Sequence, residues 1–151
     1  MGQVFDTVAG LPVHALVVHV AVVLAPLTAI GAIAMVVRPS FSRRFGPMIV
    51  ATGALAALAV VAARLSGPAL ALRVGLPVDH ERYGTWLPVV FGLLFVLLLG
   101  FWIVDRGIPL NRPRPGWVRI LAILVVVLAF ATLALTLVVG HSGAVAVWAV
   151  S

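Results

Sequence analysis

Hydrophobic residues fill four long stretches of the chain, and the few charged residues separate these stretches from one another. The runs without a formally charged residue have 31, 19, 22 and 32 residues. About 20 residues of helix cross a bilayer core roughly 30 Å thick, so each run is long enough to span a membrane once. The pattern predicts four membrane-spanning helices, near residues 12–37, 47–65, 83–104 and 117–139.

Short polar segments separate the four predicted helices. Arg38–Arg44 and Asp105–Pro115 combine arginine with proline, and Ser66–Asp79 is a longer mixed segment, so we interpret all three as loops. Asp79 is a plausible N-cap of the third helix, and Glu81 is favourably placed near the positive end of its dipole. The first helix is too long for a cleavable signal peptide and lacks a basic leader, which predicts that it is retained. Residues 1–151 are therefore interpreted as a single transmembrane domain.

Composition supports a membrane protein and excludes several other classes. The chain is 64% hydrophobic and only 9% charged, whereas soluble domains are about one quarter charged. There is no cysteine, which excludes disulfides, thiolate metal sites and cysteine nucleophiles. A net charge of +6 does not form a soluble basic face, so nucleic acid is not an expected partner. The expected partner is the lipid bilayer.

The arginines are distributed unequally between the two sides of the predicted bundle. Short arginine-rich loops stay in the cytoplasm, which predicts a multi-pass membrane protein with both termini on the outer side. The predicted cytoplasmic side holds Arg38, Arg43, Arg44, Arg106, Arg112, Arg114 and Arg119 with Asp105, and the outer side holds Arg64, Arg73 and Arg82 with Asp6, Asp79 and Glu81.

All four histidines fall in the outer layer of this topology. His14 and His19 lie in the outer half of the first helix, His80 at the start of the third, and His141 at the end of the fourth. At 1.5 Å per residue His19 lies roughly 10 Å along its helix, where a polar side chain is expected to face the bundle interior rather than lipid. An outward histidine layer is therefore the candidate binding site.

The second helix carries small residues on the face that leads to an arginine. Gly53, Ala57 and Arg64 fall close to one side of an ideal helix. Small residues permit close helix approach, so this face is expected to pack inward and to bring Arg64 to the histidine layer. A purely outward, snorkelling Arg64 is the alternative.

A short internal echo relates the two halves of the chain. Leu11-Pro12-Val13-His14 opens the first predicted helix, and Leu76-Pro77-Val78-Asp79-His80 opens the third. Each precedes a span, an arginine-bearing connection and a return helix. This pattern predicts an all-α four-helix bundle with a possible pseudo-two-fold relation between two helical hairpins.

The histidine motifs resemble those of an uncharacterised bacterial four-helix membrane family, domain of unknown function 2231. The resemblance runs from about Gly10 to Trp148. It rests on Pro12-Val13-His14 with His19 five residues later, on His80-Glu81, and on Gly140-His141-Ser142-Gly143.

Two positions depart from the family's pattern. Members of the family often have proline directly after the first and second histidines, where this chain has Ala15 and Val20. The family has no settled activity. Some relatives are joined to Rieske-type or cytochrome c-type modules, so the resemblance implies a role near membrane electron transfer.

The first functional hypothesis is a b-type haem protein that transfers electrons near the outer face of the membrane. Haem iron accepts axial imidazoles, and bundle interiors are common places for such sites. The axial candidates are His19 with His80 or His141, and His14 in a second pair. A quinone or a cytochrome c-like or Rieske-like protein would be the redox partner. The arginines placed to neutralise the haem propionates are Arg64, Arg73 and Arg82.

Two other hypotheses stay open. Neutral imidazoles also bind copper or zinc, so the four histidines could form a metal site, with Asp79 or Glu81 as an oxygen ligand or supporting partner. Alternatively, the protein is a non-redox accessory or scaffold subunit without a cofactor, which assembles through its small-residue helix faces into a homo-oligomer or with a partner. An enzyme is the weakest interpretation, since no catalytic motif is present.

Overall fold

Four long helices make up nearly all of the structure. The computed structural model describes residues 7–8, 11–74 and 78–148, and the side-chain surroundings of residues 13–68 and 80–145. Two short antiparallel strands, β1 (Thr7–Val8) and β2 (Leu11–Pro12), precede the first helix, with Thr7 opposite Pro12. The helices are α1 (Val13–Val37), α2 (Pro39–Val74), α3 (Val78–Asp105) and α4 (Gly116–Trp148).

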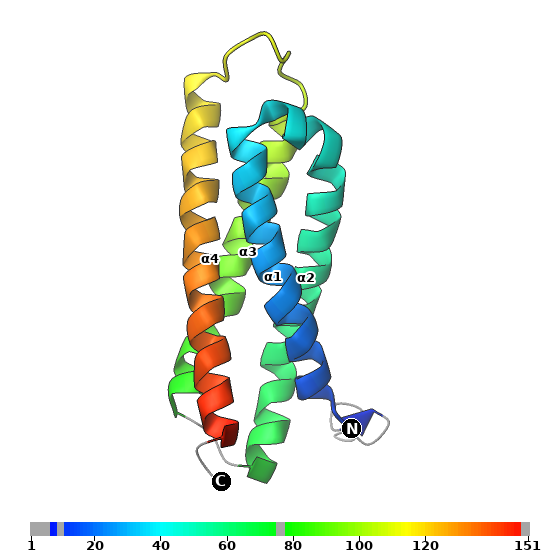
Figure 1. The fold of residues 1–151 in the computed structure, drawn as a ribbon, viewed down its shortest axis with the longest axis vertical. Coiled ribbons are helices and arrows are strands. Elements are labelled where there is room, and N and C mark those ends of the chain that lie inside the picture. Colours follow the sequence, from blue (N-terminus) through cyan, green and yellow to red (C-terminus); the bar gives the residue numbers. More distant parts are fainter. Residues whose placement is uncertain (1–6, 9–10, 75–77, 149–151) are drawn as a thin grey trace.

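The helices form an up-and-down bundle (Figure 1). Around the bundle each helix packs on its two neighbours in the order α1, α2, α3, α4, and α1 also touches α3 across the middle. The α1–α2 and α3–α4 connections lie together at one end of the bundle. The starts of α1 and α3 therefore lie at the other end, beside the final turns of α2 and α4.

All four helices are long and apolar enough to cross a membrane. Large hydrophobic side chains also cover the outside of the bundle, including Leu58, Val96 and Leu137, which are 69%, 63% and 74% exposed. In water so much exposed apolar surface would promote association, whereas a lipid environment accommodates it. The predicted four-helix membrane bundle is confirmed.

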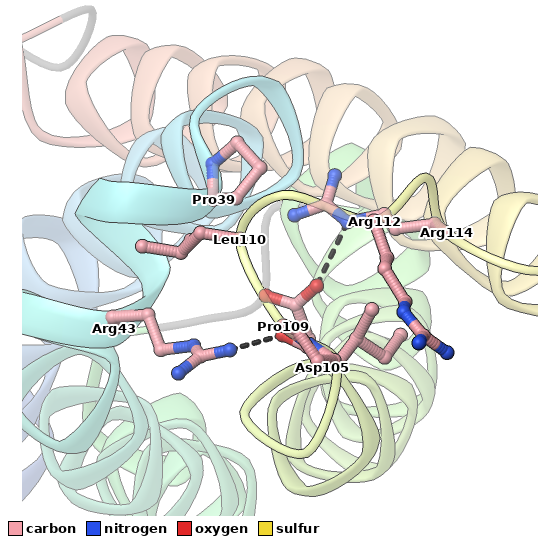
Figure 2. Close-up of a pocket in the computed structure, with 8 residues that line it drawn as sticks. Pro39, Arg43, Asp105, Pro109, Leu110, Arg112 and Arg114 are labelled. Carbon is pink, nitrogen blue, oxygen red and sulfur yellow. Dashed lines mark hydrogen bonds and ion pairs between the residues drawn. The ribbon is translucent and has the colours of Figure 1, made fainter.

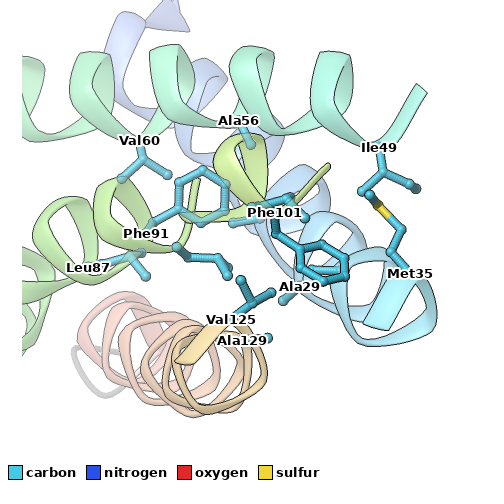
Figure 3. Packing of buried hydrophobic residues seen from close by; sticks show 14 of the residues in the cluster. Ala29, Met35, Ile49, Ala56, Val60, Leu87, Phe91, Phe101, Val125 and Ala129 are labelled. Carbon is cyan, nitrogen blue, oxygen red and sulfur yellow. The ribbon is translucent and has the colours of Figure 1, made fainter. Parts of the chain in front are cut away.

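The core is built from alanines on α1 and α2 and bulky side chains on α3 (Figure 3). Ala29 and Ala56 leave space that Phe91 and Phe101 fill, and all four are fully buried. Small residues let helix backbones approach closely, which is how membrane helices associate without a hydrophobic driving force between them. Gly53 belongs to this packing, because a Cβ there would lie 3.0 Å from the Phe95 ring.

The helices extend beyond several predicted boundaries. The expected loop Arg38–Arg44 is wrong: only Arg38 separates α1 from α2, and Pro39 occupies the first turn of α2, where a missing N–H costs nothing. Most of the expected loop Ser66–Asp79 is also helical, as far as Val74. α3 begins at Val78, and the side chain of Asp79, the predicted N-cap, lies outside the residues whose surroundings are described.

An arginine of the α3–α4 connection joins the end of α3 to the end of α1. Arg114, in the α3–α4 connection, donates from Nε to Oδ1 of Asp105 at 2.8 Å. Its other nitrogens donate to the carbonyls of Met35, at 3.2 Å, and Val36, in the last turn of α1. The guanidinium also lies over the Phe101 ring, 5.1 Å from its centroid. We call this cluster the arginine latch; it leaves the buried Asp105 carboxylate paired.

Candidate functional site

His14 contacts the final turns of α2 at the end of the bundle opposite the latch. Its Nδ1 atom lies 2.9 Å from the Ala63 carbonyl oxygen and 3.2 Å from Ser66 Oγ. Ser66 is buried and its hydroxyl donates to the Ala62 carbonyl at 2.8 Å. Gly67 lies beside the imidazole, and a Cβ at that glycine would stand 3.6 Å from His14 Cε1. We call this arrangement the His14 niche.

His80 makes the corresponding contacts with α4. Its Nδ1 atom lies 3.1 Å from the Val139 carbonyl oxygen and 3.3 Å from Ser142 Oγ. The Ser142 hydroxyl donates to Val139 at 3.0 Å. Gly143 lies beside the ring, and its Cβ would be 3.1 Å from His80 Cε1. This His80 niche repeats the spacing of the first, with a carbonyl, then a serine three residues later, then a glycine.

The hydrogen bonds fix the tautomer of both imidazoles. A backbone carbonyl has no proton to give, so Nδ1 must donate to Ala63 in one niche and to Val139 in the other. In a neutral ring Nε2 is then the nitrogen with the free lone pair. Ligating histidines in metalloproteins almost always donate their second ring nitrogen in this way. Both rings are therefore prepared to act as ligands through Nε2.

The two niches lie at the same end of the bundle. His14 is in the first turn of α1 and His80 in the first turn of α3, the two helices that touch across the bundle. Both side chains are half-buried. We call this end of the molecule the histidine end.

The other two histidines face outward. His19 is exposed, and its Nδ1 donates to the Ala15 carbonyl of its own helix at 2.5 Å, so the expectation that it faces the bundle interior is wrong. Five residues correspond to about 140° of helix rotation, so when His14 faces α2, His19 faces away. His141 is also exposed, although Ser142 beside it faces His80. The four histidines do not form one cluster.

Arginines surround the histidine end without entering it. Arg64, on α2, is exposed, which corrects the expectation that the Gly53 and Ala57 face carries it inward. Its exposure agrees with the alternative of an outward, snorkelling side chain. Arg82 on α3 is exposed as well. The side chains of Arg73 and Asp79 lie outside the residues whose surroundings are described.

Sequence reasoning missed the serines and glycines of both niches. The signal was present, because the dipeptide Ser66-Gly67 near the end of α2 recurs as Ser142-Gly143 near the end of α4. Each Ser-Gly dipeptide contacts the histidine in the first turn of the preceding helix.

Within residues 13–68 and 80–145, no three histidine or acidic side chains gather closely enough to hold a metal ion. The histidine end thus offers two imidazoles with defined tautomers rather than a complete coordination shell of protein ligands.

The apolar helices and their bundled arrangement define a multi-pass, four-helix membrane protein. Residues 10–151 match the family described as "Predicted membrane protein (DUF2231)", and the chain belongs to this family. The predicted resemblance is confirmed. No curated protein and no solved structure matches the chain in the corresponding comparisons.

Proposed function

We propose that the protein is a membrane electron-transfer protein that binds haem b through His14 and His80. The observation that carries the proposal is the Nδ1 hydrogen bond of each ring to a backbone carbonyl of the neighbouring helix, which leaves Nε2 of both rings available. This pair replaces the pairings with His19 or His141 that the sequence favoured.

Two imidazoles suit a haem better than an isolated metal ion. A structural zinc or copper site takes three or four ligands from the protein. Haem brings its own four equatorial nitrogens and needs only axial ligands, which histidines commonly supply. Because no group of three ligands gathers in the part of the chain whose side chains are described, we favour haem over copper or zinc.

The residues around the two imidazoles position them. Ser66 and Ser142 lie within hydrogen-bond distance of Nδ1 and hold their own hydroxyl protons on helix carbonyls. Such supporting bonds orient a ligating ring and raise its basicity. Arg64 and Arg82, exposed at the same end, are placed to neutralise the two propionates. When bound, the haem supplies a one-electron carrier.

The arginine balance supports an extracytoplasmic position for this site in the bacterial inner membrane. The latch end carries seven arginines and one aspartate, and arginine-rich ends face the cytoplasm. The histidine end then faces outward with both termini, where a quinol or a cytochrome c-like or Rieske-like protein exchanges electrons with it. The repeated niches also support our proposal that the two hairpins are related by a pseudo-two-fold axis.

An absorption spectrum tests the haem site. We expect the full chain, purified in detergent and supplied with haemin, to show a Soret band and a sharp reduced α-band after dithionite. His14→Ala and His80→Ala each remove a ligand and should abolish the low-spin spectrum. His19→Ala and His141→Ala, at exposed histidines, are the matched controls and should leave it unchanged.

The same samples distinguish the alternatives. If the protein stays colourless after haemin is supplied but binds copper or zinc stoichiometrically, and His14→Ala loses that metal binding, the site is a metal site and not a haem site. A protein that binds neither would be an accessory or scaffold subunit. An equal loss of colour in His19→Ala would refute the assignment of the ligands to the two niches.

Orientation has its own test, because the chain has no natural cysteine. A single cysteine in place of Glu81, exposed at the histidine end, should react with an impermeant maleimide in spheroplasts. A cysteine in place of the exposed Arg106, at the other end, should react only after lysis. The reverse result would invert the topology.

A further inference from the structure

A half-open pocket lies beside the arginine latch, at the end of the bundle opposite the histidines (Figure 2). Its charged lining comes from three segments: Arg43 on α2, Asp105 at the end of α3, and Arg112 and Arg114 in the α3–α4 connection. Three arginines around one carboxylate leave the pocket with an excess of positive charge. This charge is not used by the histidine site.

The arginines differ in how far their donors are occupied. Arg114 donates from Nε to Asp105 and from its terminal nitrogens to carbonyls at the end of α1, so its donors are occupied within the protein. Arg43 donates one terminal nitrogen to the Ile108 carbonyl and retains its other N–H groups. Arg112 is exposed, and within the described residues its guanidinium makes no hydrogen bond.

An anion with several oxygens matches these remaining donors. Arginine presents a planar fork of N–H groups that binds phosphate in a bidentate manner. The backbone already holds Arg43 in place, since its contact to Ile108 fixes the guanidinium on the α3–α4 connection. Less ordering is then required when an anion binds.

The surroundings indicate that the anion is attached to a lipid. Leu110 lines the same pocket and is 59% exposed. Val37, the last residue of α1, and Trp117, at the start of α4, are also exposed apolar residues at this end. The pocket is thus at the level where apolar helix surface gives way to arginines, the depth of phospholipid headgroups.

We propose that the pocket formed by Arg43, Arg112 and the Arg114–Asp105 pair binds the phosphate of an anionic phospholipid. Arg43 and Arg112 contact the phosphate, while Leu110 contacts the upper part of an acyl chain. Phosphatidylglycerol and cardiolipin are the lipids with this chemistry, and phosphatidylcholine, whose choline offsets the phosphate charge, is disfavoured by the surrounding arginines.

Native mass spectrometry of the full chain, delipidated in detergent, tests the site. We expect adducts with dioleoylphosphatidylglycerol to exceed those with dioleoylphosphatidylcholine. The double variant R43A/R112A should lower phosphatidylglycerol affinity at least about tenfold, because it removes two charged hydrogen-bond partners. R44A/R106A removes the same charge from the same end outside the pocket lining and should change the affinity less than about twofold.

Further arms of the experiment decide the nature of the site. R43K/R112K keeps both positive charges but loses the planar, bidentate guanidinium groups. Its affinity for phosphatidylglycerol should lie between those of the unmodified chain and R43A/R112A. Circular dichroism verifies that each variant is folded. Equal losses in R43A/R112A and R44A/R106A, or equal binding of the two lipids, would overturn the proposal. If inorganic phosphate at matched concentration displaces phosphatidylglycerol, the site is one for a free anion and the lipid assignment is wrong.

Discussion

The two ends of the bundle carry their polar groups in different chemical states. At the latch end Arg114 donates hydrogen bonds to Asp105 and to backbone carbonyls of α1, so the guanidinium and the carboxylate neutralise each other inside the protein. At the histidine end each ring donates from one nitrogen and keeps the lone pair of the other. The arginine latch is closed by its own contacts, whereas the two histidine niches are open to a ligand.

This difference separates stability from binding. Removing one member of a buried ion pair leaves an uncompensated charge, whereas removing a neutral ring loses only a modest hydrogen bond. Mutations that break the Arg114–Asp105 pair should therefore destabilise the protein. Mutations at the histidine end should leave it folded and change what it binds.

The largest effect is expected for Arg114→Ala. Asp105 is only 4% exposed, and its carboxylate would lose its charged partner, which costs about 3 kcal/mol of unfolding free energy. Equilibrium unfolding in mixed detergent and sodium dodecyl sulfate measures the loss. Arg112→Ala, an exposed arginine of the same connection, is the control in lipid-free detergent. Similar stability of the two variants would show that the latch does not fasten the bundle.

Gly46→Ala is expected to cost about 1–3 kcal/mol, because the new Cβ would lie 2.4 Å from the Trp102 ring and α2 would have to move away from α3. The control is Gly100→Ala, where nothing lies within 4 Å. There alanine should raise stability by about 0.5–1 kcal/mol, through its higher helix propensity. Thermal unfolding in detergent compares the two, and equal midpoints would contradict the tight α2–α3 contact.

His14→Ala and His80→Ala should each lower the stability of the haem-free protein by only about 1 kcal/mol, the net value of a hydrogen bond. His19→Ala should cost less, since its ring is exposed and bonds only its own helix. The same unfolding titration measures these values. A loss at either niche as large as that of Arg114→Ala would erase the distinction between the two ends.

The smallest effect distinguishes the two niches from each other. An alanine at Gly143 would press on His80 at 3.1 Å, whereas one at Gly67 would make an ordinary 3.6 Å contact with His14. If haem is bound as proposed, Gly143→Ala should weaken haem affinity by about threefold, which corresponds to about 0.65 kcal/mol, and Gly67→Ala should not. Haemin titration followed at the Soret band measures both, and the opposite order would mean that His80 tolerates displacement better than His14.

The sequence predicted the number and approximate place of the helices because lipid requires long apolar runs whatever the details of packing. It placed the ends of α2 wrongly, since Arg43 and Arg44 ended the apolar run without ending the helix. Charged residues mark where a segment leaves the hydrocarbon core of the membrane. The helix itself can extend beyond them, because arginine is a good helix former.

The candidate site was predicted only in part. His14 and His80 were both candidates, but which face of α1 carries the packed histidine depends on the position of α2, and so His19 was misplaced. The contact between Arg114 and the end of α1 joins residues 79 and 78 positions apart. No local pattern predicts such a pair, because only the assembled bundle brings the two segments together.

The arginine latch also sets an order of events during synthesis. Met35 and Val36 emerge from the ribosome long before Arg114. Their carbonyls therefore lack the arginine donor while α2 and α3 are synthesised. Chains are elongated at about 5–20 residues per second, which gives a delay of several seconds. During that interval the first hairpin depends on its own contacts. The latch can therefore close only on a nascent chain whose first three spans have been synthesised, before the fourth span is complete.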